Sequence, residues 1–185
     1  MLLACAWLLA GLLLAAPRQA RADTVDLPLL EAVQAEDGVL LSFTVRYELS
    51  KSLEQALLKG VPLYFVAEAH VYQRRWYWRD KRVGSASRTW RLAYQPLTRR
   101  YRIGFSGLSQ SYDRLDDAVQ AMQQMARWKI ADEPRAGDDG YYVEFGYRMD
   151  MSQLPRPLQI GFGGEADWSL SVERKINVAN EAPAH

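Results

Sequence analysis

Short stretches in which hydrophobic and polar residues alternate recur from residue 25 to residue 173 and predict a domain built mainly from β-strands. In residues 39–47, for example, Leu41, Phe43 and Val45 occupy every second position. Successive side chains of a strand point to opposite faces, so a period of two predicts half-buried strands. Because the stretches follow one another at hairpin distances, we expect antiparallel pairing. The clearest stretches are 39–47, 63–71, 90–94, 101–105 and 141–150.

Two helices are expected among these strands. Ser50 is suited to cap a short helix that ends at Lys59, directly before Gly60. A longer helix is expected from Asp113 to Trp128, because its apolar residues recur at helical spacing on one stripe. The fold class is therefore mainly β (α+β): an antiparallel β-sandwich or curled sheet with one long amphipathic helix and one short helix.

The first segment of the chain has the layout of a secretory signal peptide. Residues 2–16 carry no charge, and Ala20 and Ala22 supply small residues at the spacing of a cleavage site. The apolar run is shorter than the roughly 20 residues that a membrane-spanning helix needs, although an uncleaved membrane anchor remains an alternative. We therefore expect a signal peptide at 1–22, one β-rich domain at 23–176, a flexible tail at 177–185 and a periplasmic location.

Charge and cysteine content narrow the choice of partners. The chain has 23 Lys and Arg residues against 22 Asp and Glu residues, a net charge of +1, which argues against a nucleic-acid partner. The single cysteine, Cys5, lies in the expected signal peptide. The exported domain is therefore expected to contain neither a disulfide nor a thiolate nucleophile.

The positive charges are concentrated in one part of the sequence. Residues 70–102 contain ten basic residues against the single acid Asp80. We expect the hairpin at 90–105 to place Arg91 opposite Arg102 and Arg100 opposite Ala93 on its solvent face. Like charges in such positions cost about 0.2 to 1 kcal/mol, which suggests that they serve an anionic partner. Alternatively, these arginines pair with acids of neighbouring strands, such as Glu68 or Glu144.

Three consecutive aromatic residues, Trp76, Tyr77 and Trp78, lie between Arg75 and Arg79. They cannot all point inward from a strand, so at least one is expected on the opposite side or in a turn. Such a tip could anchor a protein partner, insert at a membrane interface or stack on sugars, because Trp, Tyr and Arg dominate interface hot spots. The alternative is that the rings cap one end of the fold beneath stacked arginines. The candidate partner-binding residues are Arg75, Trp76, Trp78, Arg79, Arg91, Arg100 and Arg102.

The sequence offers little for catalysis. His70 is the one histidine outside the expected tail, no cysteine accompanies it in the exported domain, and no G-x-S-x-G motif is present. The acids at 132–139 lack the spacing of a calcium loop, and the glycine-rich run at 161–164 opens no expected helix. We therefore predict no catalytic residues, no metal site and no cofactor.

Six motifs distributed along the chain carry a resemblance to a known family. The chain resembles the bacterial exported domain-of-unknown-function family 4390 over residues 25–173. The resemblance implies a protein of the Gram-negative envelope whose gene often lies beside that of a membrane sensor kinase, and it brings no catalytic residues. The motifs are GVPLYF at 60–65, RWYWRD at 75–80, SRTWRL at 87–92, LTRRY at 97–101, SQLPRPLQ at 152–159 and DWSL at 167–170.

The sequence as a whole favours an exported, non-catalytic interaction or adaptor domain with a basic, aromatic-tipped surface. The expected partner is an envelope protein, with a membrane sensor among the candidates and anionic lipid or a cell-wall polymer as other options. The alternative is a cell-wall or carbohydrate binding module, or a weak hydrolase, that uses the same aromatic residues.

Overall fold

The structure, a computed structural model, describes residues 25–77, 79–132, 140–154 and 170–180. Within these residues ten strands form two sheets, and the α-helices are two short segments, which confirms the prediction of a mainly β fold. The expected signal peptide at 1–22 and the glycine-rich run at 161–164 lie outside the described residues. Among the described residues, no helix combines the length and the apolar character that crossing a bilayer requires.

The smaller sheet has four strands in the order β10-β1-β2-β7. The two strands at its centre form an antiparallel hairpin, in which Ala35 pairs with Gly38. β10 pairs parallel to β1, and β7 pairs antiparallel to β2. These strands are β1 (Asp26–Ala35), β2 (Gly38–Arg46), β7 (Gln124–Ala131) and β10 (Ala179–Asn180).

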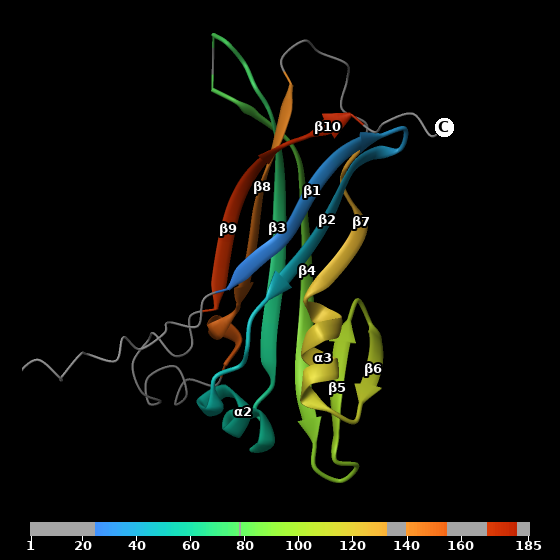
Figure 1. The fold of residues 1–185 in the computed structure, drawn as a ribbon, viewed down its shortest axis with the longest axis vertical. Coiled ribbons are helices and arrows are strands. Elements are labelled where there is room, and N and C mark those ends of the chain that lie inside the picture. The colour runs from blue at the N-terminus through green and yellow to red at the C-terminus, as the bar shows by residue number, and fades with distance from the viewer. Residues whose placement is uncertain (1–24, 78, 133–139, 155–169, 181–185) are drawn as a thin grey trace, which may run out of the picture.

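The larger sheet has six strands in the order β6-β5-β4-β3-β8-β9, and every neighbouring pair is antiparallel. β3 and β4 form a long hairpin along the axis of the molecule, and its turn projects at the end opposite α2 (Lys51–Leu58) (Figure 1). The strands are β3 (Leu63–Gln73), β4 (Lys81–Gln95), β5 (Arg100–Phe105), β6 (Leu108–Tyr112), β8 (Tyr141–Met149) and β9 (Ser171–Asn177).

The two sheets pack face to face over one hydrophobic core (Figure 1). Phe43 of β2 meets Phe145 of β8 with ring centroids 4.8 Å apart, and Tyr47 stacks on Phe65 at 5.5 Å. Along β3 the predicted inward positions are all buried, whereas Glu68 on the opposite face is half-buried. Burial of one face per strand explains the period of two in the sequence. The inward residues of β3 are Leu63, Phe65, Ala67, Ala69 and Val71.

The predicted short helix is confirmed as α2 (Lys51–Leu58). Ser50 is its N-cap, and the Ser50 side chain accepts a hydrogen bond from the backbone N–H of Leu53. Gly60 follows the helix with a φ of 87°, a conformation that favours glycine. The apolar side chains of Leu53 and Leu57 are buried in the core, so capping and burial together fix this helix.

The prediction of one long helix from Asp113 to Trp128 is wrong. Helix α3 covers only Leu115–Met122, and β7 begins at Gln124. The outer edge of β2 would otherwise have no strand partner, and β7 supplies one. Arg127, with a φ of 50°, interrupts any helical continuation, and its N–H donates to the Ser42 side chain at 3.0 Å. Arg114 occupies the N-cap position of α3 and forms no side-chain cap bond.

The C-terminal part also differs from the expected pattern. β9 extends to Asn177, and β10 forms within the segment predicted as a tail at 177–185. The Val178 N–H donates to the Tyr141 carbonyl at 2.9 Å, and Val33 pairs with Ala179. The chain end thus joins both sheets as far as residue 180. The apolar stretch at 158–162, which the sequence also predicts as a strand, lies outside the described residues.

Candidate interaction surface

The turn between β3 and β4 presents two aromatic side chains to solvent. Trp76 is 86% exposed and Tyr77 is 69% exposed. Their rings meet edge to face, with centroids 5.2 Å apart. Aromatic residues are more often packed than exposed, and adjacent exposed apolar side chains commonly mark an interaction site. We call residues 74–82, apart from residue 78, the tip.

Asp80 and Tyr142 hold the tip in a defined shape. One carboxylate oxygen of Asp80 accepts a hydrogen bond from the Arg75 backbone N–H at 3.2 Å, and the other accepts from the Tyr142 hydroxyl at 2.9 Å. Burial raises the pKa of Tyr142, and the bond to Asp80 raises it further. Tyr142 therefore keeps its proton and donates to Asp80 at neutral pH. Its ring also stacks on Tyr72 at 5.2 Å.

Cations surround the base of the tip. The Arg74 guanidinium donates to the Asn177 side chain at 2.6 Å and lies 5.6 Å from the Tyr142 ring centre. Lys175 of β9 lies over the same ring at 3.6 Å. An open hollow of ≈ 660 Å³ lies beside Trp76, and Arg74 and Lys175 contribute to its lining. The hollow is lined by Arg74, Arg75, Trp76, Asp80, Gly140, Tyr142 and Lys175.

The predicted partner-binding residues fall into two groups that lie far apart. Arg75, Trp76 and Arg79 belong to the tip, and Trp78 lies outside the described residues. Arg91 is ten residues beyond Lys81 on β4, a separation of about 33 Å along the strand. Arg100 and Arg102 lie on β5, near the same end as Arg91. The basic block of the sequence therefore forms two separate surfaces in the fold.

The predicted register of the β4–β5 hairpin is wrong. Arg91 pairs with Gly104, and Arg102 pairs with Ala93, so the two arginines are not directly opposite each other. The loop consists of residues 96–99, one residue later than expected, and Arg99 adopts a φ of 53° within it. The cost of like charges in opposite positions therefore supplies no argument for a binding role of these arginines.

Local polar groups contact Arg91, Arg100 and Arg102, the three arginines of the second basic surface. Arg100 forms an ion pair with Asp113 at 2.7 Å. Arg102 donates to the Ser109 hydroxyl at 2.6 Å, and Arg91 donates to the Tyr64 hydroxyl at 3.3 Å. The acids expected as their alternative partners are engaged elsewhere: Arg148 binds Glu68 at 3.1 Å, and Lys175 binds Glu144 at 3.6 Å.

Arg88 adds nothing to either basic surface. It pairs with Ala67 on the face of β4 that points between the sheets. Its guanidinium lies 5.3 Å from the Phe105 ring centre and 5.6 Å from the Trp128 ring centre. The Arg88 Nε is buried and has no hydrogen-bond partner among the described residues. The position of the Arg88 guanidinium beside two aromatic rings therefore compensates only in part for the burial of its Nε.

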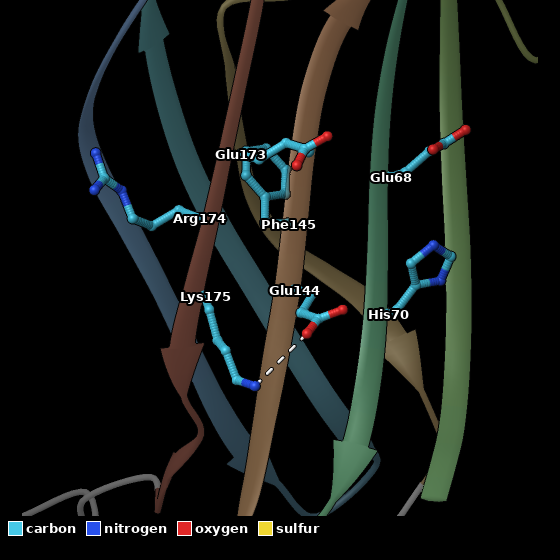
Figure 2. Close-up of a pocket in the computed structure, with 8 residues that line it drawn as sticks. Glu68, His70, Glu144, Phe145, Glu173, Arg174 and Lys175 are labelled. Atoms are coloured by element: carbon cyan, nitrogen blue, oxygen red, sulfur yellow. Dashed lines mark ion pairs between the residues drawn. The ribbon is translucent and has the colours of Figure 1, made fainter. Parts of the chain in front are cut away.

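His70 belongs to a shallow hollow of ≈ 380 Å³ on the outer face of the larger sheet (Figure 2). Figure 2 shows Glu68 beside His70 on β3 and the ion pair between Glu144 and Lys175. His70 Nδ1 lies 2.9 Å from the Ser85 hydroxyl, a hydrogen bond. Among the described residues no group of three or more His, Cys, Asp or Glu side chains could hold a metal ion. Two carboxylates of this hollow, Glu68 and Glu144, form ion pairs with Arg148 and Lys175.

Sequence analysis missed two residues that shape the tip, Tyr142 and Lys175. Both come from strands about 60 to 100 residues further along the chain than the tip, and the register of β8 and β9 brings them there. Val172 and Ile176 are the half-buried positions of β9, but Arg174 between them interrupts the period of two, so the sequence carries only a weak signal for this strand.

Comparison with known proteins gives one match. A family model described as "Domain of unknown function (DUF4390)" matches residues 22–177, most of the chain. No curated protein matches the chain, and no solved structure matches it.

Proposed function

The chain belongs to the DUF4390 family, and from that premise we propose that it is a non-catalytic interaction module of the Gram-negative envelope. In this proposal the two packed sheets form a β-sandwich scaffold, and the tip is its contact surface. The observation that carries the proposal is the exposure of Trp76 and Tyr77 on a turn that Asp80 and Tyr142 hold in shape.

The hydrogen bonds to Asp80 fix the shape of the tip, and a fixed shape supports a binding role because it lowers the entropy cost of association. A contact residue that is already ordered loses less conformational freedom when a partner arrives. Trp, Tyr and Arg are also the residues that contribute most at interfaces, and the tip contains all three. The second basic region supports the proposal less well, because local contacts already engage Arg91, Arg100 and Arg102.

The envelope location is part of the proposal and derives from the sequence. The uncharged run at 2–16 and the small residues before position 23 support export. Cell fractionation combined with mass measurement of the isolated protein tests this part. We expect a periplasmic form that starts at residue 23, and a cytoplasmic full-length form would overturn the proposed location.

Photo-crosslinking in living cells tests the contact surface. A photoreactive phenylalanine analogue replaces Tyr77 in one full-length variant and Leu97 in another. Leu97 is fully exposed on the β4–β5 turn at the opposite end of the molecule and is the matched control. We expect reproducible adducts from position 77 that the control lacks and that Arg75→Gln/Arg79→Gln removes.

The adducts also separate the candidate partners. A single envelope protein would support an adaptor, and a glycan adduct would support the alternative, a cell-wall binding module in which Trp76 stacks on a sugar ring. Equal capture from both positions, or no capture from position 77, would overturn the tip as the contact surface.

A further inference from the structure

We propose that the tip docks on an anionic phospholipid surface, with Trp76 and Tyr77 at the membrane interface and the surrounding cations on headgroup phosphates. This inference rests on the proposed function and names the class of partner for the same surface. It follows from the exposure of the rings, the charge around them, the adjacent hollow and the shape of the hairpin.

The two exposed rings suit the boundary between water and lipid. Indole and phenol rings have an apolar body and a polar group, and they are enriched at the headgroup level of membrane proteins. The rings of Trp76 and Tyr77 meet edge to face at 5.2 Å, so they present one compact aromatic unit. The β3–β4 turn that carries both residues stands at one end of the molecule (Figure 1), and both side chains are largely exposed.

The charge around the rings is strongly positive. The single acid of the tip, Asp80, uses both carboxylate oxygens as acceptors within the fold. A basic residue close to an anionic membrane strengthens binding by about fivefold, and such contributions accumulate. The basic residues at the tip and its base are Arg74, Arg75, Arg79, Lys81, Arg82 and Lys175.

The hollow beside Trp76 suits a headgroup phosphate. Its ≈ 660 Å³ are open to solvent and are lined by the cations Arg74, Arg75 and Lys175 and by the Asp80 carboxylate. Lys175 also pairs with Glu144 at 3.6 Å, so Arg74 and Arg75 would be the main phosphate ligands. Guanidinium groups bind phosphate oxygens through paired N–H donors. Trp76 lines the same hollow, so a lipid whose phosphate lies there would have its apolar part beside the indole.

The shape of the hairpin is compatible with docking on a flat surface. The β3–β4 turn projects past the ends of β8 and β9 along the longest axis (Figure 1). A projecting end reaches a flat surface without collision with the rest of the fold, which suits a membrane. The rings and the cations also lie together at this end, which is the arrangement of a peripheral membrane anchor.

A fluorescent probe at the tip tests the inference in the full chain. In a Cys5→Ser background, Tyr77→Cys carries an environment-sensitive fluorophore, and Thr98→Cys on the β4–β5 turn is the matched control. The vesicles contain phosphatidylcholine and phosphatidylglycerol in equal parts, or phosphatidylcholine alone. We expect a blue shift at position 77 with the anionic vesicles only and none at position 98. Higher salt should weaken the response, because it screens the attraction.

Two double variants test the role of the tip charges. Neutralising two basic residues near an anionic membrane lowers affinity by roughly 30-fold, so we expect this loss for Arg75→Gln/Arg79→Gln. Arg91→Gln/Arg102→Gln changes the net charge equally at the far end, and we expect it to bind like the parent. Circular dichroism shows whether each variant is folded.

Three results would overturn the inference: no response at position 77, an equal response with neutral vesicles, or an equal loss in both double variants. Binding through residues 2–16 alone would leave position 77 unchanged and would count against the inference. A missing vesicle response together with a tip-specific protein adduct in cells would overturn the lipid partner and leave the proposed function standing. A failure of both experiments would remove the tip as a contact surface.

Discussion

The hydroxyl oxygens of Tyr47 and Tyr147 lie 3.0 Å apart at the centre of the core, where the end of β2 meets β8. Both rings are buried, and Tyr147 also donates to the Met122 carbonyl at the end of α3, at 3.4 Å. Burial raises the pKa of both tyrosines well above the usual range, so they remain neutral hydrogen-bonding groups. This pair connects the two sheets and the end of a helix inside an otherwise apolar core.

The tyrosine pair predicts unequal effects of two similar substitutions. Tyr147→Phe should lower the free energy of unfolding by about 1 to 3 kcal/mol, because the Tyr47 hydroxyl stays buried without its partner. Tyr47→Phe should lower the free energy of unfolding by less, since the Tyr147 hydroxyl can still donate a hydrogen bond to the Met122 carbonyl. Urea unfolding of the two variants and of the double variant measures this. In the double variant the two losses should not add. Equal losses of stability in the two single variants that add in the double variant would contradict a hydrogen bond between Tyr47 and Tyr147.

A close approach of the two sheets at Gly84 supports a second prediction. A Cβ atom at Gly84 would overlap the side chain of Ala131 on β7 and come within 3.1 Å of the Ile130 carbonyl oxygen. Gly84→Ala should therefore destabilise the fold by about 1 to 3 kcal/mol through overpacking. Gly104→Ala is the matched control, because its nearest neighbours, both in Arg91, lie 3.9 Å away. Thermal unfolding should separate the two, and an equal effect would contradict close sheet packing there.

The strands could be predicted because burial decides them locally. Leu63, Phe65 and Ala67 face the core, and most residues on the opposite face of β3 are only half-buried, so the sequence carries much of the period of two directly. The segment after Met122 was harder, because its apolar residues fit both a helical stripe and a strand. This segment forms strand β7 rather than a continuation of the helix, because the edge of β2 needs a strand partner. A tertiary requirement of this kind is not visible in local spacing.

The candidate surface could be predicted only in outline. The sequence located the aromatic and basic residues around Trp76, but the separation of Arg91 from them follows from the length of β4. The register of the β4–β5 hairpin differs by one residue in its loop from the expected one, and the positive φ of Arg99 in that loop is not indicated by the sequence. Tyr142 and Lys175 reach the tip through pairing with distant strands. Such contacts depend on topology rather than on motifs.

Asp150 supports a prediction about acid stability. Hydrogen bonds from Ser152 lower the pKa of Asp150, and the charge of Arg148 lowers it further. A lowered pKa in the folded state means that the stabilisation is fully present above the ordinary value of 3.8 and is lost as the pH falls through the folded value. Asp150→Asn keeps an acceptor for the Ser152 N–H and removes the charge.

We therefore expect the stability difference between the parent and Asp150→Asn to be constant near neutral pH and to shrink below about pH 4. Urea unfolding across this range measures it. Ser152→Ala is a useful companion, because it removes the main cause of the lowered pKa and should reduce the dependence on pH. A difference that persists unchanged in acid would show that the Asp150 charge has no stabilising role.

The last prediction concerns the shape of the tip. Asp80→Ala removes the acceptor for both the Arg75 N–H and the Tyr142 hydroxyl, so the turn that carries Trp76 should lose its order. Hydrogen exchange of the Arg75 amide should become roughly tenfold faster or more, because hydrogen bonds to a charged group are among the stronger ones. Mass spectrometry of the exchanged protein measures this at the tip.

Asp113→Ala is the control for this variant, because it removes an equal charge from the opposite end, where Asp113 pairs with Arg100. It should leave the Arg75 amide unchanged. Tyr142→Phe removes only the hydroxyl and keeps the ring that stacks on Tyr72, so its effect should be intermediate. Unchanged exchange in Asp80→Ala would show that the tip does not depend on Asp80. Trp76 and Tyr77 would then reach a partner from a flexible turn, at a higher entropy cost of binding.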